Sequence, residues 1–178
     1  MKKIAALLLS FALLLSLCAC SMDPTLVGTT PRKETGSELS QDTNTAAFKL
    51  GDVVELDNVT VGFTDVIINN GSDYNKPNDG NVFVLCEFEI TNNSNEELSV
   101  SSMLCFDAYC DGYASSLSLQ ALIEKGDKAQ LDGTVAAGKK MKGVVGYEVP
   151  SDWQELEIHY TIDVVRDNTI IFTATNEQ

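Results

Sequence analysis

Two cysteines one residue apart, Cys18 and Cys20, are the first side chains in the sequence whose chemistry could decide where the protein acts. Such a pair can hold a metal ion through two thiolates, enter a disulfide framework, or carry a lipid. A tetrahedral metal site needs two further ligands, and no candidate follows Cys20 before Asp23. The residues that precede Cys18 therefore decide among a metal site, a disulfide and a lipid anchor.

Those residues have the layout of a secretory signal peptide. Lys2 and Lys3 form a basic head, and an apolar run of fourteen residues extends from Ile4 to Leu17. As a helix this run would reach about 21 Å, which is too short for about 30 Å of bilayer hydrocarbon. The sequence predicts export, with the run removed by cleavage.

The end of the leader, Leu17-Cys18-Ala19-Cys20, resembles the bacterial lipobox. In that motif a Leu and two small residues precede a cysteine that becomes lipid-modified. The resemblance implies cleavage between Ala19 and Cys20, a lipoprotein signal peptide over 1–19, and a diacylglyceryl group on Cys20. Because two acyl chains give stable attachment, we expect a protein anchored at the extracytoplasmic face of the cell membrane. A secreted protein cleaved near Ala19 remains the alternative.

The stretch after the anchor, 20–47, predicts a disordered tether. It is rich in Thr, Ser, Gly, Pro, Asp and Glu, and it has no aromatic residue before Phe48. Such a composition buries too little apolar surface to offset the entropy of ordering. Its 27 residues after Cys20, treated as a flexible coil, would have a mean reach of about 29 Å.

The charge of the chain excludes one class of partner. The formal net charge is −14 at pH 7, and removal of the leader with Lys2 and Lys3 makes the mature chain more negative still. Because neutralisation of phosphates supplies most nucleic-acid affinity, we expect no binding to DNA or RNA. A cation or a basic partner would suit the acidic body better.

The remaining 131 residues, 48–178, are enough for one domain with its own core. Period-two alternation predicts strands, Asp111-Gly112 predicts a tight hairpin turn, and 118–126 could form one short helix. We therefore expect an all-β domain, an immunoglobulin-like antiparallel β-sandwich of about seven or eight strands. The segments with strand patterns are 53–68, interrupted at Asn58, and 81–90, 98–110, 142–150, 155–165 and 169–175.

Three ordered stretches, "NVFVLCEFEITNNSNEELSV", "CFDAYCDGY" and "VAAGKKMKGVVGYEVPSDW", resemble a family of Gram-positive lipoprotein domains of unknown function. That family is related in fold to a mycobacterial secreted immunoprotective antigen. The resemblance implies an immunoglobulin-like sandwich and assigns no catalytic residue. The chain departs from the family pattern at Ala137, where Pro is usual, and at Tyr147, where Phe is usual. The matching residues are Asn92, Asn93, Ser94, Phe106, Asp107, Asp111, Gly112, Gly138, Lys139, Lys140, Gly143, Tyr147, Val149 and Pro150.

Two sets of side chains in the body could react. His159, the single histidine, stands beside Glu157, but no Ser or Cys is placed by the local sequence to serve as its nucleophile, so we expect an exposed strand residue. Cys86, Cys105 and Cys110 allow at most one disulfide among them. Whether that disulfide forms stays open. Cys105 and Cys110 are five positions apart, so their side chains would point to opposite faces of one continuous strand and could not bond directly.

Two further sets could bind ions. The loop 69–80 offers oxygen donors from Asp73, Asn75, Asn78 and Asp79, but the spacing fails the EF-hand pattern; a solvated loop is favoured, and Ca²⁺ stays an alternative. The lysines at 139, 140 and 142 form the one basic cluster. They could guard a sheet edge or dock to a polyanion.

The sequence favours a cell-surface binding or protein-interaction module that uses no cofactor and is not an enzyme. The alternative is a hydrolase, or its accessory subunit, that acts on cell-envelope glycans through paired carboxylates from Asp107, Asp111 and Asp152. Trp153 alone is available for stacking on sugar rings, which disfavours a polysaccharide binder.

Overall fold

The computed structural model describes residues 23–29, 47–163 and 168–176. The predictions for Cys18, Ala19 and Cys20, the signal peptide, and most of the tether lie outside these residues. The described residues form twelve strands and one helix. No helix among them is long and apolar enough to cross a membrane.

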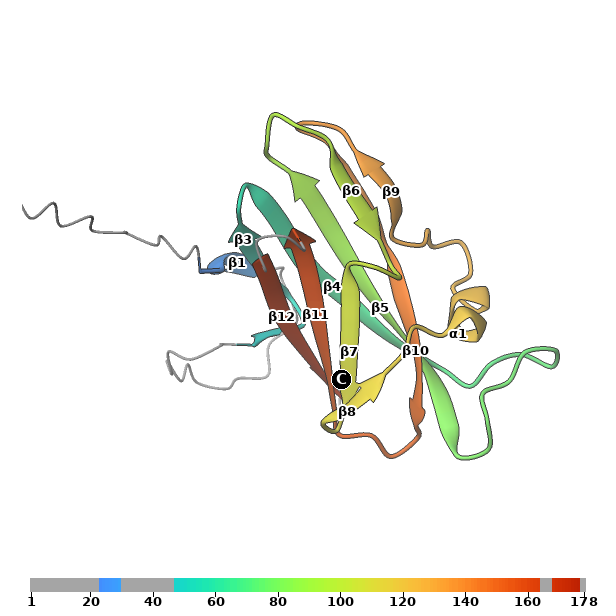
Figure 1. Cartoon of the computed structure of the whole chain (residues 1–178). Helices are drawn as coiled ribbons and strands as arrows, with labels where there is room; N and C mark the ends of the chain where they lie inside the picture. The colour runs from blue at the N-terminus through green and yellow to red at the C-terminus, as the bar shows by residue number, and fades with distance from the viewer. Residues whose placement is uncertain (1–22, 30–46, 164–167, 177–178) are drawn as a thin grey trace, which may run out of the picture.

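Two five-stranded sheets form the two layers of a sandwich (Figure 1). All strand pairs within them are antiparallel except the short pair of β2 with β12. The first sheet has the order β1 (Thr25–Thr29), β3 (Asp52–Leu56), β4 (Val59–Asn69), β5 (Asn81–Asn92) and β10 (Lys140–Pro150). The second has the order β2 (Phe48–Lys49), β12 (Asn168–Thr175), β11 (Glu155–Asp163), β7 (Phe106–Cys110) and β8 (Tyr113–Ser115). The predicted all-β sandwich is confirmed.

The core lies between the two sheets and is built from alternate residues of each strand. Phe63 and Phe88 stack in the first sheet with ring centroids 4.7 Å apart. Phe172 of the second sheet meets both rings edge-on, at 5.8 and 5.3 Å. Aromatic contacts of this kind hold sheets together beyond simple area burial, so these three side chains join the two layers.

Two hairpin turns use residues with positive φ, which the sequence predicted for the second of them. Asp57 and Asn58 (φ 50° and 61°) connect β3 to β4, and Asp111 and Gly112 (φ 49° and 81°) connect β7 to β8. A two-residue turn with both φ angles positive matches the right-handed twist of the paired strands. The interruption predicted at Asn58 and the turn predicted at Asp111-Gly112 are both confirmed.

The single strand pattern over 98–110 corresponds to two strands that belong to different sheets. Its first part is β6 (Leu98–Ser101), which pairs with β9 (Asp132–Val135) in a separate two-stranded sheet, and its second part is β7. The chain turns between them, where the Cys105 N–H donates to the Ser101 carbonyl oxygen at 2.9 Å. The strands that no alternation pattern indicated are short, with two to five residues each. β2 and β8 are too short to show alternation, and exposed and buried residues do not alternate along β1 and β9.

The expectation that 21–47 lacks regular structure is wrong for Thr25–Thr29. These residues form β1, which pairs with β3 through Thr25 with Glu55, Leu26 with Val54, Gly28 with Val53 and Thr29 with Asp52. Its composition gives little apolar burial, but the open backbone groups of β3 supply partners that composition cannot reveal. The folded body therefore includes Thr25–Thr29 as well as the predicted domain.

The helix α1 (Leu119–Ile123) and its flanks cover the outer face and the free border of β10. Ser118 caps the helix by accepting a hydrogen bond from the Ala121 N–H at 3.1 Å, and the short helix predicted over 118–126 is confirmed. Ala121 and Leu122 pack on Phe83 and Leu85. A Cβ atom on Gly146 would lie only 3.0 Å from the Ala121 Cβ, so glycine allows the close approach.

Candidate functional site

The turn before β7, the β7–β8 hairpin and the start of α1 carry large apolar side chains that face solvent. Met103, Tyr113 and Leu119 are 66%, 79% and 59% exposed, and Tyr109 is also exposed. We call these four residues the hairpin surface. Two cavities flank the hairpin and share Ala114 and Ser115 in their walls. Exposed apolar groups beside hollows are typical of surfaces that bind another molecule.

The first cavity has a volume of about 410 Å³. Met103, Tyr109 and Leu119 line it together with Asp107. It lies on the outer side of the hairpin, because Tyr109 and its cross-strand partner Ala114 point to the same side of the second sheet.

The second cavity, of about 610 Å³, lies at the border of the sandwich where β8 meets the end of β10. Tyr113 lines it on one side, and three acidic residues line it as well: Asp111, Glu148 and Asp152. The structure therefore brings together two of the three acids that the sequence singled out and places Asp107 in the other cavity. Glu148 was not foreseen, since its position in the strand "GYEVP" carries no motif.

Two of these carboxylates already hold the backbone of neighbouring segments. Asp111 accepts from the N–H groups of Gln154 and Glu155 at 3.0 and 2.8 Å, which joins the hairpin turn to the start of β11. Glu148 accepts from the Asn78 N–H at 2.8 Å and from the Asn81 side-chain amide at 3.0 Å. Burial acts to raise the pKa of Glu148, but the hydrogen bonds from Asn81 and Asn78 outweigh it and lower that pKa.

The candidate calcium loop is tied to the body by its amides. The Asn75 side-chain amide donates to the Gln120 carbonyl oxygen at 2.8 Å and to the Glu124 carboxylate at 2.7 Å. Asp73 and Asp79 are exposed. In the described part of the chain, no three or more His, Cys, Asp or Glu side chains gather in a group that could hold a metal ion.

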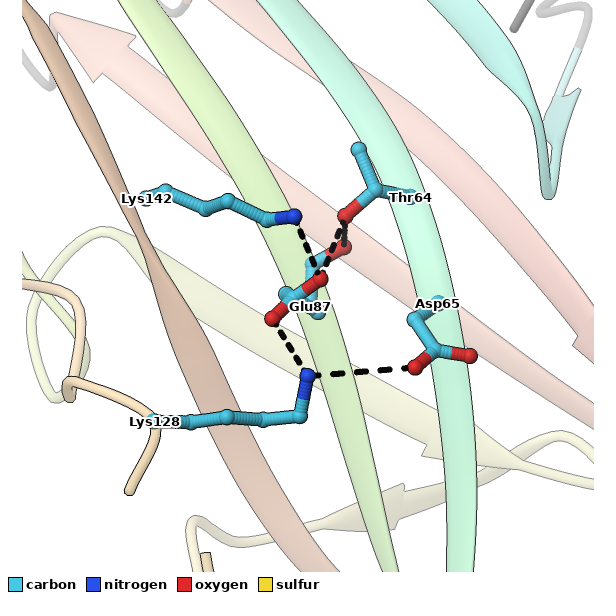
Figure 2. Close-up of polar contacts among 5 residues, drawn as sticks. All are labelled: Thr64, Asp65, Glu87, Lys128 and Lys142. Carbon is cyan, nitrogen blue, oxygen red and sulfur yellow. Dashed lines mark hydrogen bonds and ion pairs between the residues drawn. The ribbon is translucent and has the colours of Figure 1, made fainter. Parts of the chain in front are cut away.

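The most buried acidic side chain lies on the outer face of the first sheet. Glu87 of β5 is only 6% exposed, and its carboxylate accepts from Lys128 at 2.6 Å and from the Thr64 hydroxyl at 3.0 Å, and pairs with Lys142 at 2.9 Å. Figure 2 shows both ammonium groups and the hydroxyl pointing at this one carboxylate. Lys128 also lies 3.9 Å from Asp65.

The surroundings of Glu87 keep it ionised. Burial acts to raise the pKa of Glu87, but hydrogen bonds from Lys128, Lys142 and Thr64 outweigh burial and hold that pKa below its ordinary value. The hydrogen bond to Glu87 raises the pKa of Lys128 in turn. All the charged groups of this cluster find partners within it, which is typical of a structural ion-pair network.

The basic cluster predicted at 139–142 is divided between two environments. Lys140 pairs with Glu89 at 2.9 Å and Lys142 pairs with Glu87, while Lys139 is exposed in the turn before β10. Because alternate residues of a strand share a face, Lys140 and Lys142 both reach acids of β5. These contacts agree with guarding of an edge strand, and within this described cluster they leave only Lys139 without an ion pair for the polyanion alternative.

His159 is less exposed than its sequence context indicated. Its side chain is 25% exposed, its ring contacts Glu157 Oε1 at 2.5 Å, and its centroid lies 5.3 Å from that of Tyr109. It faces Asp107 across the β7–β11 pair. The neighbouring aromatic ring on β7, which the local sequence does not show, covers the imidazole.

The three cysteines of the described residues are free thiols, so no disulfide forms among them. Cys86 and Cys110 are buried and Cys105 is half-buried. Burial raises the pKa of Cys86, and burial together with Asp111 and Asp152 raises the pKa of Cys110 to about 11. Both thiols behave as small hydrophobic groups in the core.

These features define an all-β sandwich domain whose family-typical residues hold the backbone in place. Asn92, for example, is fully buried and its side-chain amide donates to the carbonyl oxygens of Glu96 and Val135 at 2.7 and 2.8 Å. The chain belongs to the family described as "Domain of unknown function (DUF4352)", whose profile matches residues 48–170. The resemblance inferred from the sequence is thereby confirmed.

Two solved structures from Bacillus subtilis are similar in fold to this chain. A candidate lipoprotein (ycdA) from Bacillus subtilis subsp. subtilis strain 168 has a TM-score of 0.57 and 21% identity; the match covers 68% of this chain and 38% of that one. The yjhA protein from Bacillus subtilis has a TM-score of 0.53 and 17% identity, with 70% and 97% of the two chains covered. A comparison with curated proteins finds no match. At these identities the likeness concerns the fold alone.

Proposed function

We propose that the protein is a lipoprotein anchored through Cys20 at the extracytoplasmic face of the membrane, and that its sandwich binds a polypeptide partner through the hairpin surface. The anchor is supported by the lipobox-like stretch Leu17 to Cys20 that follows a signal-peptide pattern. The structural relative from Bacillus subtilis described as a candidate lipoprotein is consistent with this location.

The observation that carries the binding proposal is the exposure of Met103, Tyr113 and Leu119 beside two cavities. Aromatic residues and Met are enriched where proteins meet, because aromatic rings bury large areas with few rotatable bonds and the flexible Met side chain adapts to its partner. The acidic wall of the second cavity, with Asp152 exposed, suits a partner segment that carries Lys or Arg. The partner is accordingly a polypeptide with apolar and basic side chains.

Two contacts favour binding over glycan hydrolysis. A general acid needs a raised carboxyl pKa, whereas the pKa of Glu148 is lowered by the amides of Asn81 and Asn78 against the effect of burial. Asp111 is engaged by two backbone N–H groups. Movement of either carboxylate toward a substrate would break hydrogen bonds that hold the cavity together.

The anchor is tested by mass spectrometry of the detergent-extracted protein. We expect an N-terminal peptide that begins at Cys20 and carries a diacylglyceryl group. In a Cys20→Ala variant the protein should leave the membrane fraction. Recovery of an unmodified chain that begins after Ala19 would refute the lipoprotein assignment.

The binding surface is tested by photo-crosslinking on living cells. A photoreactive phenylalanine derivative at Tyr113 should give a discrete adduct with one partner protein, and the same derivative at Tyr74 is the matched control. Tyr74 is fully exposed and lines neither of the two cavities. With the purified partner, Tyr113→Ser should weaken binding by about tenfold or more, as for an aromatic anchor of an interface. Equal yields of the adduct at both positions would refute the proposal that the hairpin surface is the binding site.

A further inference from the structure

We propose that the bilayer faces the β1 border of the sandwich, so that the hairpin surface points away from the membrane toward partners in the aqueous space. This inference rests on the anchoring of Cys20 proposed above. It assigns a lipid-facing surface to the domain and restricts the partner of the hairpin surface to molecules outside the bilayer.

The length of chain between the anchor and β1 carries the argument. Only the four residues 21–24 separate Cys20 from Thr25, the first residue of β1. Five Cα–Cα steps span at most about 18 Å. A tether that was free up to residue 47 would instead have a mean reach of about 29 Å, and its fully extended length would be much greater. While β1 is paired with β3, the anchor cannot leave the neighbourhood of this border.

The surface of β1 is suited to lie near lipid headgroups. The strand "TLVGT" carries no charge, and its Leu26 and Val27 side chains are 47% and 50% exposed. The rest of the chain is strongly acidic, and acidic surface is repelled by anionic lipids. A neutral strand with exposed apolar groups is therefore the part of this border that best tolerates contact with a bilayer.

The order of the strands places the hairpin surface at the side of the sandwich opposite the β1 border. β1 is the first strand of the first sheet and β10 the last, and in the second sheet β2 and β8 hold the corresponding positions. β2 and β12 contact β3, whereas β8 contacts β10, and Figure 1 shows β1 on the side of the molecule opposite α1. Four interstrand spacings amount to about 19 Å, so the hairpin surface lies about that much farther from the anchor.

The test uses two insertions of the same length in the full lipidated chain. Twenty Gly/Ser residues are placed either between Ser21 and Met22, before β1, or between Gly36 and Ser37, after it. A donor dye on a non-natural amino acid at Lys49, near the β1 border, or at Tyr113 reports energy transfer to a headgroup dye in phosphatidylglycerol–phosphatidylethanolamine vesicles. We expect stronger transfer from position 49 than from position 113 in the parent chain.

The insertion before β1 should reduce transfer from position 49 by about half, because it adds a coil with a mean length of about 25 Å. The insertion after β1 should leave transfer unchanged, since it only enlarges a loop whose two ends are held. In a Leu26→Pro/Val27→Pro variant, where β1 cannot pair, both insertions should act alike. Equal effects of the two insertions in the parent, with the protein still bound to vesicles, would overturn this inference alone. Failure of the chain to float with vesicles would overturn the anchoring itself.

Discussion

Glu87 Oε1 lies 2.6 Å from Lys128 Nζ, although the two residues are forty-one positions apart and belong to a central strand and to the segment that follows α1. The pair fixes this segment on the outer face of the first sheet. Lys142, on the neighbouring strand β10, engages the other oxygen of the same carboxylate. The outer face is therefore held by apolar contacts under α1 at Phe83 and Leu85 and by charge at Glu87.

Replacement of Glu87 by Gln should lower the free energy of unfolding by about 2 kcal/mol at pH 7, because it removes two charge-assisted contacts of a buried carboxylate. The folded-state pKa of Glu87 is below its ordinary value. Its contribution is thus complete above the ordinary carboxyl pKa and is lost as the pH falls through the folded-state pKa. Urea denaturation should show a constant difference between the parent and the variant from pH 6 to 8 and a smaller one below about pH 4.

Glu89→Gln is the matched control for this prediction. Its partner Lys140 is 63% exposed and Glu89 itself 40%, and exposed ion pairs contribute about 0.5 kcal/mol or less. Equal losses of stability in the two variants would contradict the structural role assigned to Glu87.

Gly143→Ala should destabilise the domain by about 1–3 kcal/mol. A Cβ atom at this position would lie 2.8 Å from the carbonyl oxygen of Ala129, which is part of the backbone that pairs with β10. Gly62→Ala serves as the control, since its new Cβ would meet its nearest neighbour at an ordinary 3.5 Å. Thermal unfolding of both variants should show a lower Tm only for position 143; an unchanged Tm there would argue against the close approach.

Tyr160→Phe should leave stability unchanged or raise it by up to about 1 kcal/mol. The Tyr160 hydroxyl is buried without a hydrogen-bond partner among the described residues, and an unsatisfied buried polar group costs free energy. Tyr74→Phe, at a fully exposed position, should have no effect. Differential scanning calorimetry measures both, and a clear loss of stability in Tyr160→Phe would reveal a hydrogen bond to this hydroxyl.

Alkylation of the folded protein at pH 8 should discriminate among the three core thiols. Cys110, with its pKa raised to about 11 by burial and nearby acids, and Cys86, also buried, should react at least about 100-fold more slowly than in guanidinium chloride. Half-buried Cys105 should react sooner. Peptide mass spectrometry resolves the sites, and labelling that requires a reductant would show a disulfide instead of free thiols.

The sequence predicted those parts of the fold that have long alternating patterns or distinctive turn residues. The strands β5 and β10, the turn at Asp111-Gly112 and the short helix within 118–126 follow from local chemistry, which a single segment contains. The strands β1, β2 and β9 do not, because each is short and pairs with the backbone of a strand that is distant in the sequence.

The candidate site was predicted only in part for the same reason. Asp111 and Asp152 meet in one cavity because the β7–β8 turn packs against the start of β11, a relationship that the fold creates. The ring of Tyr109 beside His159 and Lys142 at Glu87 likewise come from neighbouring strands, and Lys128 comes from the segment after α1. A sequence pattern reports which face of a strand is apolar, but it does not report which strand lies next to it.

The covered border of β10 also bears on how copies of this protein behave when crowded. The Val144 N–H and carbonyl oxygen are bonded to Ala129 and Leu131, and the Gly146 carbonyl oxygen accepts from the Ser118 N–H. The backbone in the middle of β10 is therefore already hydrogen-bonded and cannot pair with the strand of another molecule. Lys140 and Lys142 lie at the start of β10, where the backbone is uncovered. At high local concentration the protein should thus not aggregate into fibrils through edge-to-edge pairing of β10.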